Sequence, residues 1–167
     1  VMLHMWEKAK DFIRKAFTII FLATIIIWFL QSFDWRLNAV QNSADSILAS
    51  IGSFIAPLFT PLGFGDWRAS TALITGITAK ETVVSTLTVL TGAQSGAQLG
   101  QILGTIFTPL SAFSFLAFTV LYMPCVAAFA AERRELGSTR GALLASLYQT
   151  GAAYVVALLI YQVGSLF

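Results

Sequence analysis

The stretch Gly76-Ile77-Thr78-Ala79-Lys80-Glu81 places two opposite charges in the middle of an otherwise apolar run from Ala69 to Leu90. An ionisable side chain at the centre of a transmembrane helix costs roughly 2.5 to 3.5 kcal/mol, so we expect both charges to lie within protein or to face water. Lys80 and Glu81 are adjacent and project about 100° apart on a helix, so they do not pair with each other. Each therefore needs a partner elsewhere, and the default interpretation of such a site is functional.

The composition is that of an integral membrane protein. Of the 167 residues, 57% are hydrophobic and 11% are charged, whereas soluble domains carry roughly 25% charged residues. The formal net charge is +2, and the basic residues cluster between positions 8 and 15 and between positions 133 and 140, next to apolar runs. Such clusters set the orientation of a membrane protein and argue against nucleic acid as a partner.

The residues that catalysis would need are missing. One cysteine, Cys125, excludes an intramolecular disulfide, a Cys-only zinc site and an iron–sulfur cluster held by this chain alone. The sequence has no nucleophile–histidine arrangement, no HExxH motif and no phosphate-binding Gly-x-x-x-x-Gly-Lys-Ser/Thr motif. We therefore assign no catalytic or cofactor-binding residues and expect this chain not to be an enzyme.

The apolar pattern predicts an all-α, polytopic membrane helical bundle. Residues 1–15 are predicted to form a cytoplasmic amphipathic helix in the membrane interface, and residues 16–167 the transmembrane domain. Basic residues place the start of the first span, residues 17–30, in the cytoplasm, and residues 34–45 then form an extracytoplasmic loop. Because the chain opens inside an amphipathic helix, we expect it to be a fragment of something longer.

Re-entrant or discontinuous helices are expected within this bundle. The segment from Ser46 to Pro61, with helix-breaking prolines at 57 and 61, is either a tilted span or a re-entrant half-helix, and its length does not decide. Asp66 is placed to cap a helix that starts at Trp67. Gly76 before the charged pair and the β-branched residues after it favour local unwinding, the form that discontinuous transporter helices take around ion sites.

The last part of the chain predicts two further spans. Residues 113–131 form one that is interrupted by Tyr122-Met123-Pro124-Cys125, and residues 142–164 form the next. The chain then crosses five times if residues 46–61 span the membrane, and three times if that segment and the one after it are re-entrant.

Glycines at positions 92, 96, 100 and 104 recur every four residues. Such a repeat lets the backbone of a neighbouring helix approach closely. A flexible loop that runs into a short helix is an equally good interpretation of its first part.

Pro124 and its neighbours are candidates for a metal site. Pro124 has no amide proton, so it frees the backbone oxygen of Val120, which in lipid must find a partner or line a cavity. Cys125 and Met123 offer a thiol and a thioether, soft donors that suit late first-row metals better than Mg²⁺ or Ca²⁺. A lone cysteine in an apolar helix is more often a small packing residue, so the pattern alone favours packing.

Three polar residues complete the candidates. Glu81 would supply a hard oxygen ligand; the alternatives are a structural ion pair or a surface carboxylate. Lys80 would balance charge when no metal is bound. Gln149 is deep enough in the last span to lie on a transport path, although interhelical hydrogen bonding is the more common role of such a residue.

Three ordered motifs resemble the C-terminal half of the membrane domain, the second Gate half, of the ferrous iron transport protein B (FeoB) family. They are Pro57-Leu58-Phe59-Thr60-Pro61-Leu62-Gly63-Phe64-Gly65-Asp66-Trp67-Arg68-Ala69, then Leu73-Ile74-Thr75-Gly76 running into Ala79-Lys80-Glu81-Thr82-Val83-Val84, then Leu121-Tyr122-Met123-Pro124-Cys125-Val126-Ala127. The resemblance covers essentially the whole chain.

This resemblance implies a multi-pass protein of the bacterial inner membrane that takes up Fe²⁺, its transported substrate. Cys125 matches the cysteine usually proposed to meet the metal, and Glu81 matches the acidic residue of the Ala-Lys-Glu motif, so Cys125, Glu81 and Met123 become the expected metal contacts. Lys80, Val120, Pro124 and Gln149 are expected along the path. The family's GTPase domain, which uses GTP and Mg²⁺, and its first Gate half are partners absent from this chain, which should neither bind GTP nor transport alone. A homo-oligomer is a further expectation.

Two other functions stay open. Gate-type folds are shared with permeases for nucleosides or other organic solutes; there Glu81 and Gln149 would hydrogen-bond the substrate and Cys125 would be a packing residue. A membrane scaffold that does not transport would instead use the glycine repeat as its association surface.

Overall fold

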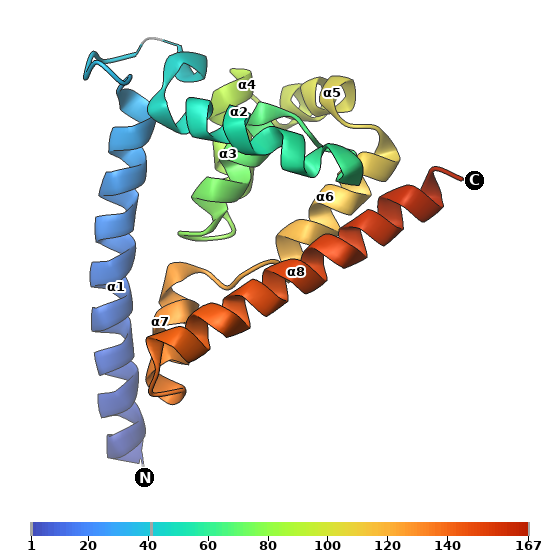
Figure 1. The fold of residues 1–167 in the computed structure, drawn as a ribbon. Helices are drawn as coiled ribbons and strands as arrows, with labels where there is room; N and C mark the ends of the chain where they lie inside the picture. Colours follow the sequence, from blue (N-terminus) through green and yellow to red (C-terminus); the bar gives the residue numbers. More distant parts are fainter. Residues whose placement is uncertain (1, 41, 167) are drawn as a thin grey trace.

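The computed structural model describes residues 2–40 and 42–166, with side chains from residue 20 onward and at Trp6, Lys10, Phe17 and Thr18. Apart from one isolated bridge between Phe33 and Ala39, the regular structure of these residues is helical, which confirms the predicted all-α fold. In chain order (Figure 1) the helices are α1 (Met2–Ser32), α2 (Ile47–Phe59), α3 (Trp67–Gly76), α4 (Thr82–Thr91), α5 (Gly96–Ile106), α6 (Pro109–Leu121), α7 (Val126–Glu135) and α8 (Thr139–Gly164).

Helix α1 runs unbroken beside the rest of the fold and contacts α2 near one end and α7 nearer the other (Figure 1). The predicted division at residue 15 is not a break in its backbone. Most side chains that carry the amphipathic pattern lie outside the described residues, so the interfacial placement of residues 1–15 stays a prediction. From residue 20 onward α1 exposes large apolar side chains such as Phe21, Ile26 and Trp28, as expected of a surface that faces lipid or another protein segment.

Helices α2 and α3 form a bent pair and not a straight span. A 3₁₀ turn, Thr60–Leu62, follows α2, and Gly63 then turns the chain with a left-handed φ of 86°. Residues 47–62 and α3 meet at an angle of 103°. As predicted, Asp66 caps α3, because its Oδ1 accepts a hydrogen bond of 2.7 Å from the Arg68 amide.

The prediction that Pro57 breaks its helix is wrong. Pro57 lies inside α2, which continues to Phe59 before the 3₁₀ turn that contains Pro61 begins. Pro57 lies two residues before the end of α2, so the lost hydrogen bond and the bend that a proline favours leave the earlier turns of the helix intact.

Within the described residues, two helical segments are long and apolar enough to cross a membrane, Pro109–Glu135 and Thr139–Gly164. The bent pair of α2 and α3 would make a third if it acts as one broken span. The first two correspond to the predicted spans 113–131 and 142–164, and together they support a membrane helical bundle.

Aromatic rings form the core and lead to the break after α6. Phe64 packs against Phe59 and Phe115 with ring centroids 5.4 and 5.3 Å apart, and Phe118 stacks on Tyr122 at 5.5 Å. Helix α8 closes on this cluster through small residues, and its Ala157 carbonyl accepts a 3.0 Å hydrogen bond from the Ser114 hydroxyl of α6. The core therefore fixes the position of Tyr122, where α6 ends.

The predicted loop after α1 is held together by Asp34. Its Oδ1 accepts hydrogen bonds from the amides of Arg36, at 2.7 Å, and Asn38, at 2.9 Å. These hydrogen bonds hold the pKa of the Asp34 carboxyl below its usual value, and the bond from the Asn38 amide contributes most. Leu37 has a left-handed φ of 60° inside this turn.

None of the described residues packs closely against the glycine repeat. Gly92 ends α4 with a left-handed φ of 67°, and a Cβ at Gly96, Gly100 or Gly104 of α5 would meet nothing within 4 Å. Use of this face for association stays a prediction.

Gly52 sets the distance between α2 and α3, so its replacement by alanine should destabilise the fold. A Cβ there would meet the Thr71 Oγ1 and lie 3.0 Å from the Trp67 carbonyl oxygen. We expect Gly52→Ala to lower the free energy of unfolding by about 1–3 kcal/mol, the usual cost of overpacking. Gly151→Ala is the matched control, because a Cβ there meets nothing within 4 Å. Thermal unfolding of the intact protein measures both, and equal effects would contradict this packing.

Candidate functional site

A helical hairpin and an interrupted helix meet at the centre of the candidate site. Helices α3 and α4 fold back on each other (Figure 1), whereas α7 follows α6 after a break. The chain leaves helical geometry between α3 and α4, residues 77–81, and again between α6 and α7, residues 122–125. Both departures from helical geometry were predicted from the sequence, but the one between α3 and α4 is the turn of a hairpin and not the local unwinding of one helix. The amide of Val126 donates a 2.9 Å hydrogen bond to the carbonyl of Ile77, so the two breaks are joined through their backbones.

Threonine hydroxyls stabilise the first break. The Thr78 hydroxyl donates to the Thr75 carbonyl at 2.7 Å, and the Thr82 hydroxyl lies 2.7 Å from the Ala79 carbonyl and 3.0 Å from that of Thr75. A buried 2.8 Å hydrogen bond also joins the Thr75 and Thr86 side chains across the break. These side chains satisfy carbonyls that a continuous helix would have satisfied. No role was predicted for these threonines, although their spacing around Gly76 was a usable signal.

Tyr122 locks the second break against the first. Its side chain is buried, and its hydroxyl donates a 3.2 Å hydrogen bond to the Leu73 carbonyl in α3. The ring reaches α3 because position 76 is glycine, where a Cβ would lie 2.5 Å from the Tyr122 hydroxyl oxygen. No function was predicted for Tyr122, although a hydroxyl-bearing ring two residues before a proline in an apolar span was an available signal.

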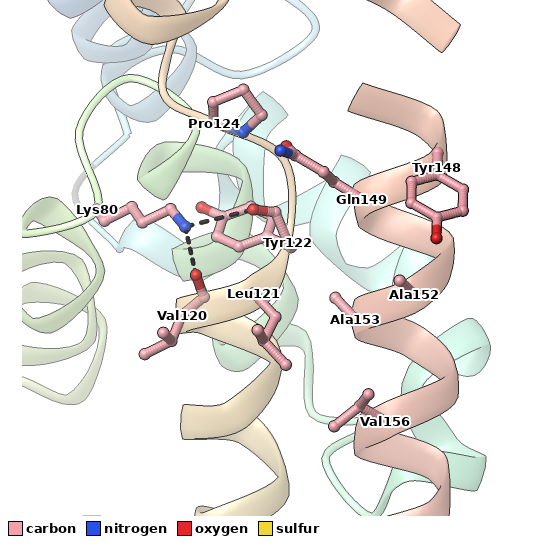
Figure 2. Close-up of a pocket in the computed structure, with 10 residues that line it drawn as sticks. All are labelled: Lys80, Val120, Leu121, Tyr122, Pro124, Tyr148, Gln149, Ala152, Ala153 and Val156. Carbon is pink, nitrogen blue, oxygen red and sulfur yellow. Dashed lines mark hydrogen bonds between the residues drawn. The ribbon is translucent and has the colours of Figure 1, made fainter. Parts of the chain in front are cut away.

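Lys80 crosses from the first break to the second. Its Nζ donates hydrogen bonds to the carbonyl oxygens of Val120, at 2.8 Å, and Tyr122, at 3.3 Å (Figure 2). The same ammonium lies 5.0 Å from the centroid of the Tyr122 ring, within cation–π range. The expectation that the freed Val120 oxygen needs a partner is confirmed, and that partner is Lys80. A cation at the carboxyl end of α6 is also favoured by the helix dipole.

A pocket of about 400 Å³ opens between this arrangement and α8. It is lined by all four residues that were expected along the path, Lys80, Val120, Pro124 and Gln149. In Figure 2 the Gln149 amide reaches from α8 toward Pro124. The structure therefore brings together Lys80 and Gln149, which lie 69 positions apart in the sequence.

The three expected metal contacts lie in different surroundings. Cys125 is a free, half-buried cysteine at the N-cap of α7, the last residue of the second break. Met123 is half-buried and packs against the hydrophobic core. Glu81 is exposed, at the residue before α4.

No preformed metal centre is visible in this arrangement. In the part of the chain that the structure describes, no three His, Cys, Asp or Glu side chains come together as ligands. The metal-binding roles of Cys125, Glu81 and Met123 stay predictions.

Comparison with known proteins identifies the family. The family model described as "Gate: Nucleoside recognition" matches residues 13–139, most of the chain. The chain belongs to the Gate family. This Gate segment is also 42% identical, over 97% of its length, to a protein of Staphylococcus aureus (strain MSSA476) called Fe(2+) transporter FeoB. A protein of Methanocaldococcus jannaschii with the same name is 40% identical over 99% of the segment.

A third relative is a fusion of two proteins. The Fe(2+) transport protein A/Fe(2+) transporter FeoB fusion protein of Porphyromonas gingivalis is 31% identical over the whole Gate segment. The segment covers only 24–25% of the length of these three relatives. No solved structure matches it significantly. The matches confirm the resemblance to the FeoB family.

The contact between Gly76 and Tyr122 predicts coupled effects of two substitutions. Gly76→Ala should lower the free energy of unfolding of the intact protein by about 1–3 kcal/mol, because the new methyl group would crowd the Tyr122 hydroxyl and the Val83 side chain. Tyr122→Phe alone should cost about 1 kcal/mol through the lost hydrogen bond to Leu73.

The double variant separates this contact from general destabilisation. Removing the hydroxyl makes room for the methyl group, so the double variant should lose less stability than the sum of the single variants. Denaturant or thermal unfolding of all four proteins measures the coupling, and strictly additive losses would show that the two residues do not touch.

Proposed function

We propose that this Gate segment forms half of the path by which a FeoB-type transporter moves Fe²⁺ across the membrane. The observation that carries the proposal is the Lys80 ammonium, a positive charge already held on two backbone carbonyl oxygens at the break between α6 and α7 that also contains Cys125. Unwound backbone at membrane depth is tolerated where it is buried in protein or lines a cavity, and transporters use its carbonyls to coordinate cations.

The donors around the breaks suit weak, successive contacts with Fe²⁺. Cys125 would provide the soft donor, and the Val120 carbonyl a hard one. Glu81, exposed beside the break, would attract the hydrated ion before it reaches Cys125. Met123 is a secondary contact, and Lys80 balances charge when the metal is absent. Contacts of this kind allow release, because an ion that is bound too tightly does not leave.

The remaining parts of the proposed transporter lie outside this segment. We place the segment as the second Gate half, in the bacterial inner membrane, acting with a first Gate half and an N-terminal domain that hydrolyses GTP with Mg²⁺. Self-association into a homo-oligomer belongs to the same proposal. The coverage of about a quarter of each relative supports a longer protein of this kind.

A permease for nucleosides is the second candidate, because the matched family is described by nucleoside recognition. In that case Gln149 and Glu81 would hydrogen-bond the substrate, and the half-buried Cys125 would only pack. Uptake of Fe²⁺ by proteoliposomes that is not inhibited by excess nucleosides would favour the iron path; inhibition by nucleosides would favour the permease.

Replacing the expected metal contacts in the intact transporter should reduce Fe²⁺ uptake by different amounts. Cys125→Ser should lower the initial rate about tenfold, which corresponds to a lost interaction of about 1.4 kcal/mol. Glu81→Gln should lower it only a few-fold, and less at high salt, because an exposed charge acts through screened attraction. Anaerobic uptake of ⁵⁵Fe²⁺ into proteoliposomes at matched protein amounts measures both.

Glu135→Gln is the matched control for Glu81→Gln. Glu135 is also exposed, but it lies at the far end of α7 from the break, so its neutralisation should not change uptake. If Cys125→Ser and Glu81→Gln both transport as the wild type does, neither residue meets the metal.

A further inference from the structure

The group that Lys80 occupies is itself suited to binding a cation. Two carbonyl oxygens, those of Val120 and Tyr122, accept from its Nζ, and the Tyr122 ring presents its face at 5.0 Å. Carbonyl oxygens and aromatic faces attract cations in general and are not specific to an ammonium. The carbonyls are available because α6 ends at Leu121 and Pro124 cannot donate a hydrogen bond.

The ammonium and a free cation would exclude each other here. None of the described residues that line the pocket beside Lys80 is acidic, so no lining carboxylate offsets a second positive charge. Two cations a few ångströms apart in a half-buried site repel strongly. A metal ion can therefore contact these oxygens only after the ammonium leaves them.

Lys80 also lines two pockets. One, of about 400 Å³, lies between the α6–α7 break and α8; the other, of about 510 Å³, lies among α4, α5 and α6. Of the described residues that line these pockets, Lys80 alone belongs to both. It lies in an unwound stretch and carries a long flexible side chain, so it can change position without disrupting a helix.

We propose that the Val120 and Tyr122 carbonyls and the Tyr122 ring form a cation site that Lys80 fills as a tethered cation, and that an incoming divalent cation displaces it. Lys80 is then a competitor of the ion at a position that both pockets share. This inference deepens the proposed function and rests on it for the choice of a divalent cation as cargo.

The first test compares Lys80→Ala with Lys80→Arg and the wild type. Mn²⁺ serves as a redox-stable probe, and its binding to the intact protein in nanodiscs is measured by calorimetry. If Lys80 fills the site about nine-tenths of the time, its removal should lower the Kd for Mn²⁺ about tenfold, because apparent affinity scales with the fraction of free sites. Lys80→Arg, which keeps a cation, should bind as weakly as the wild type.

Lys10→Ala is the matched control, since Lys10 is exposed on α1 and should not affect Mn²⁺ binding. Competition by methylammonium is a second measurement, because replacing a lysine that has a merely structural role would not change it. Methylammonium should compete with Mn²⁺ in Lys80→Ala, where it can fill the vacated site, and not in the wild type. An unchanged or higher Kd in a folded Lys80→Ala protein, without competition by methylammonium, overturns the proposal.

A second measurement uses the wild-type protein, so it stands even if Lys80→Ala does not fold. Acetic anhydride labels accessible lysines, and mass spectrometry quantifies each site. Saturating Mn²⁺ should increase the labelling of Lys80, because its ammonium leaves the carbonyls, and should leave Lys10 unchanged. Labelling of Lys80 that stays constant or falls contradicts displacement.

The two proposals fail in different ways. Wild-type proteoliposomes without Fe²⁺ flux, combined with tighter Mn²⁺ binding by Lys80→Ala, would disprove iron transport and keep the tethered cation. Normal Fe²⁺ flux with no effect of Lys80→Ala on binding would keep the transporter and disprove the tethered cation.

Discussion

Backbone carbonyls that lose their helical partners inside a membrane must be satisfied by something other than water, and this constraint organises the structure. At the end of α6, the Lys80 ammonium satisfies such carbonyls, with a hydrogen bond of 2.8 Å to that of Val120 and one of 3.3 Å to that of Tyr122. At the end of α3, threonine hydroxyls and the Tyr122 hydroxyl do the same. The unwound segments persist because each supplies partners for the other.

The hydrogen bonds from Lys80 to these carbonyls also explain why a charged residue is tolerated in an apolar run. An ammonium in lipid would be costly, but here it replaces the amide donors that α6 lacks beyond its last turn. The charge is thus a structural substitute for missing hydrogen-bond donors. The same property makes it a natural point of competition with another cation, since what stabilises the ammonium would stabilise a metal ion too.

The sequence predicted the interruptions well because their causes are local. A proline always removes a donor, so the free Val120 oxygen could be anticipated from Pro124 alone. An aspartate before an apolar helix is a local cap, and Asp66 caps α3 as expected. Pro57 was misjudged because its effect depends on where α2 ends, and that end is set by packing of Phe59 in the aromatic core.

The partners across the breaks could not be predicted in the same way. Lys80 and Val120 are 40 residues apart, and only the meeting of α3, α4, α6 and α7 brings them together. The rule that adjacent residues project about 100° apart applies to a helix, whereas Lys80 and Glu81 lie in an unwound stretch, where one side chain turns inward and the other stays exposed. Likewise, no pattern in the sequence showed that Tyr122 would reach Leu73.

The single hydrogen bond from Val126 to Ile77 has a mechanical consequence. Val126 is the first residue of α7, a rigid rod of ten residues and about 15 Å. Movement of its other end, where Arg133 and Arg134 lie, would act through this helix on the segment that carries Lys80 and Glu81. A domain that moves α7 from outside the bilayer would thus shift the charged pair, Lys80 and Glu81, without contacting it.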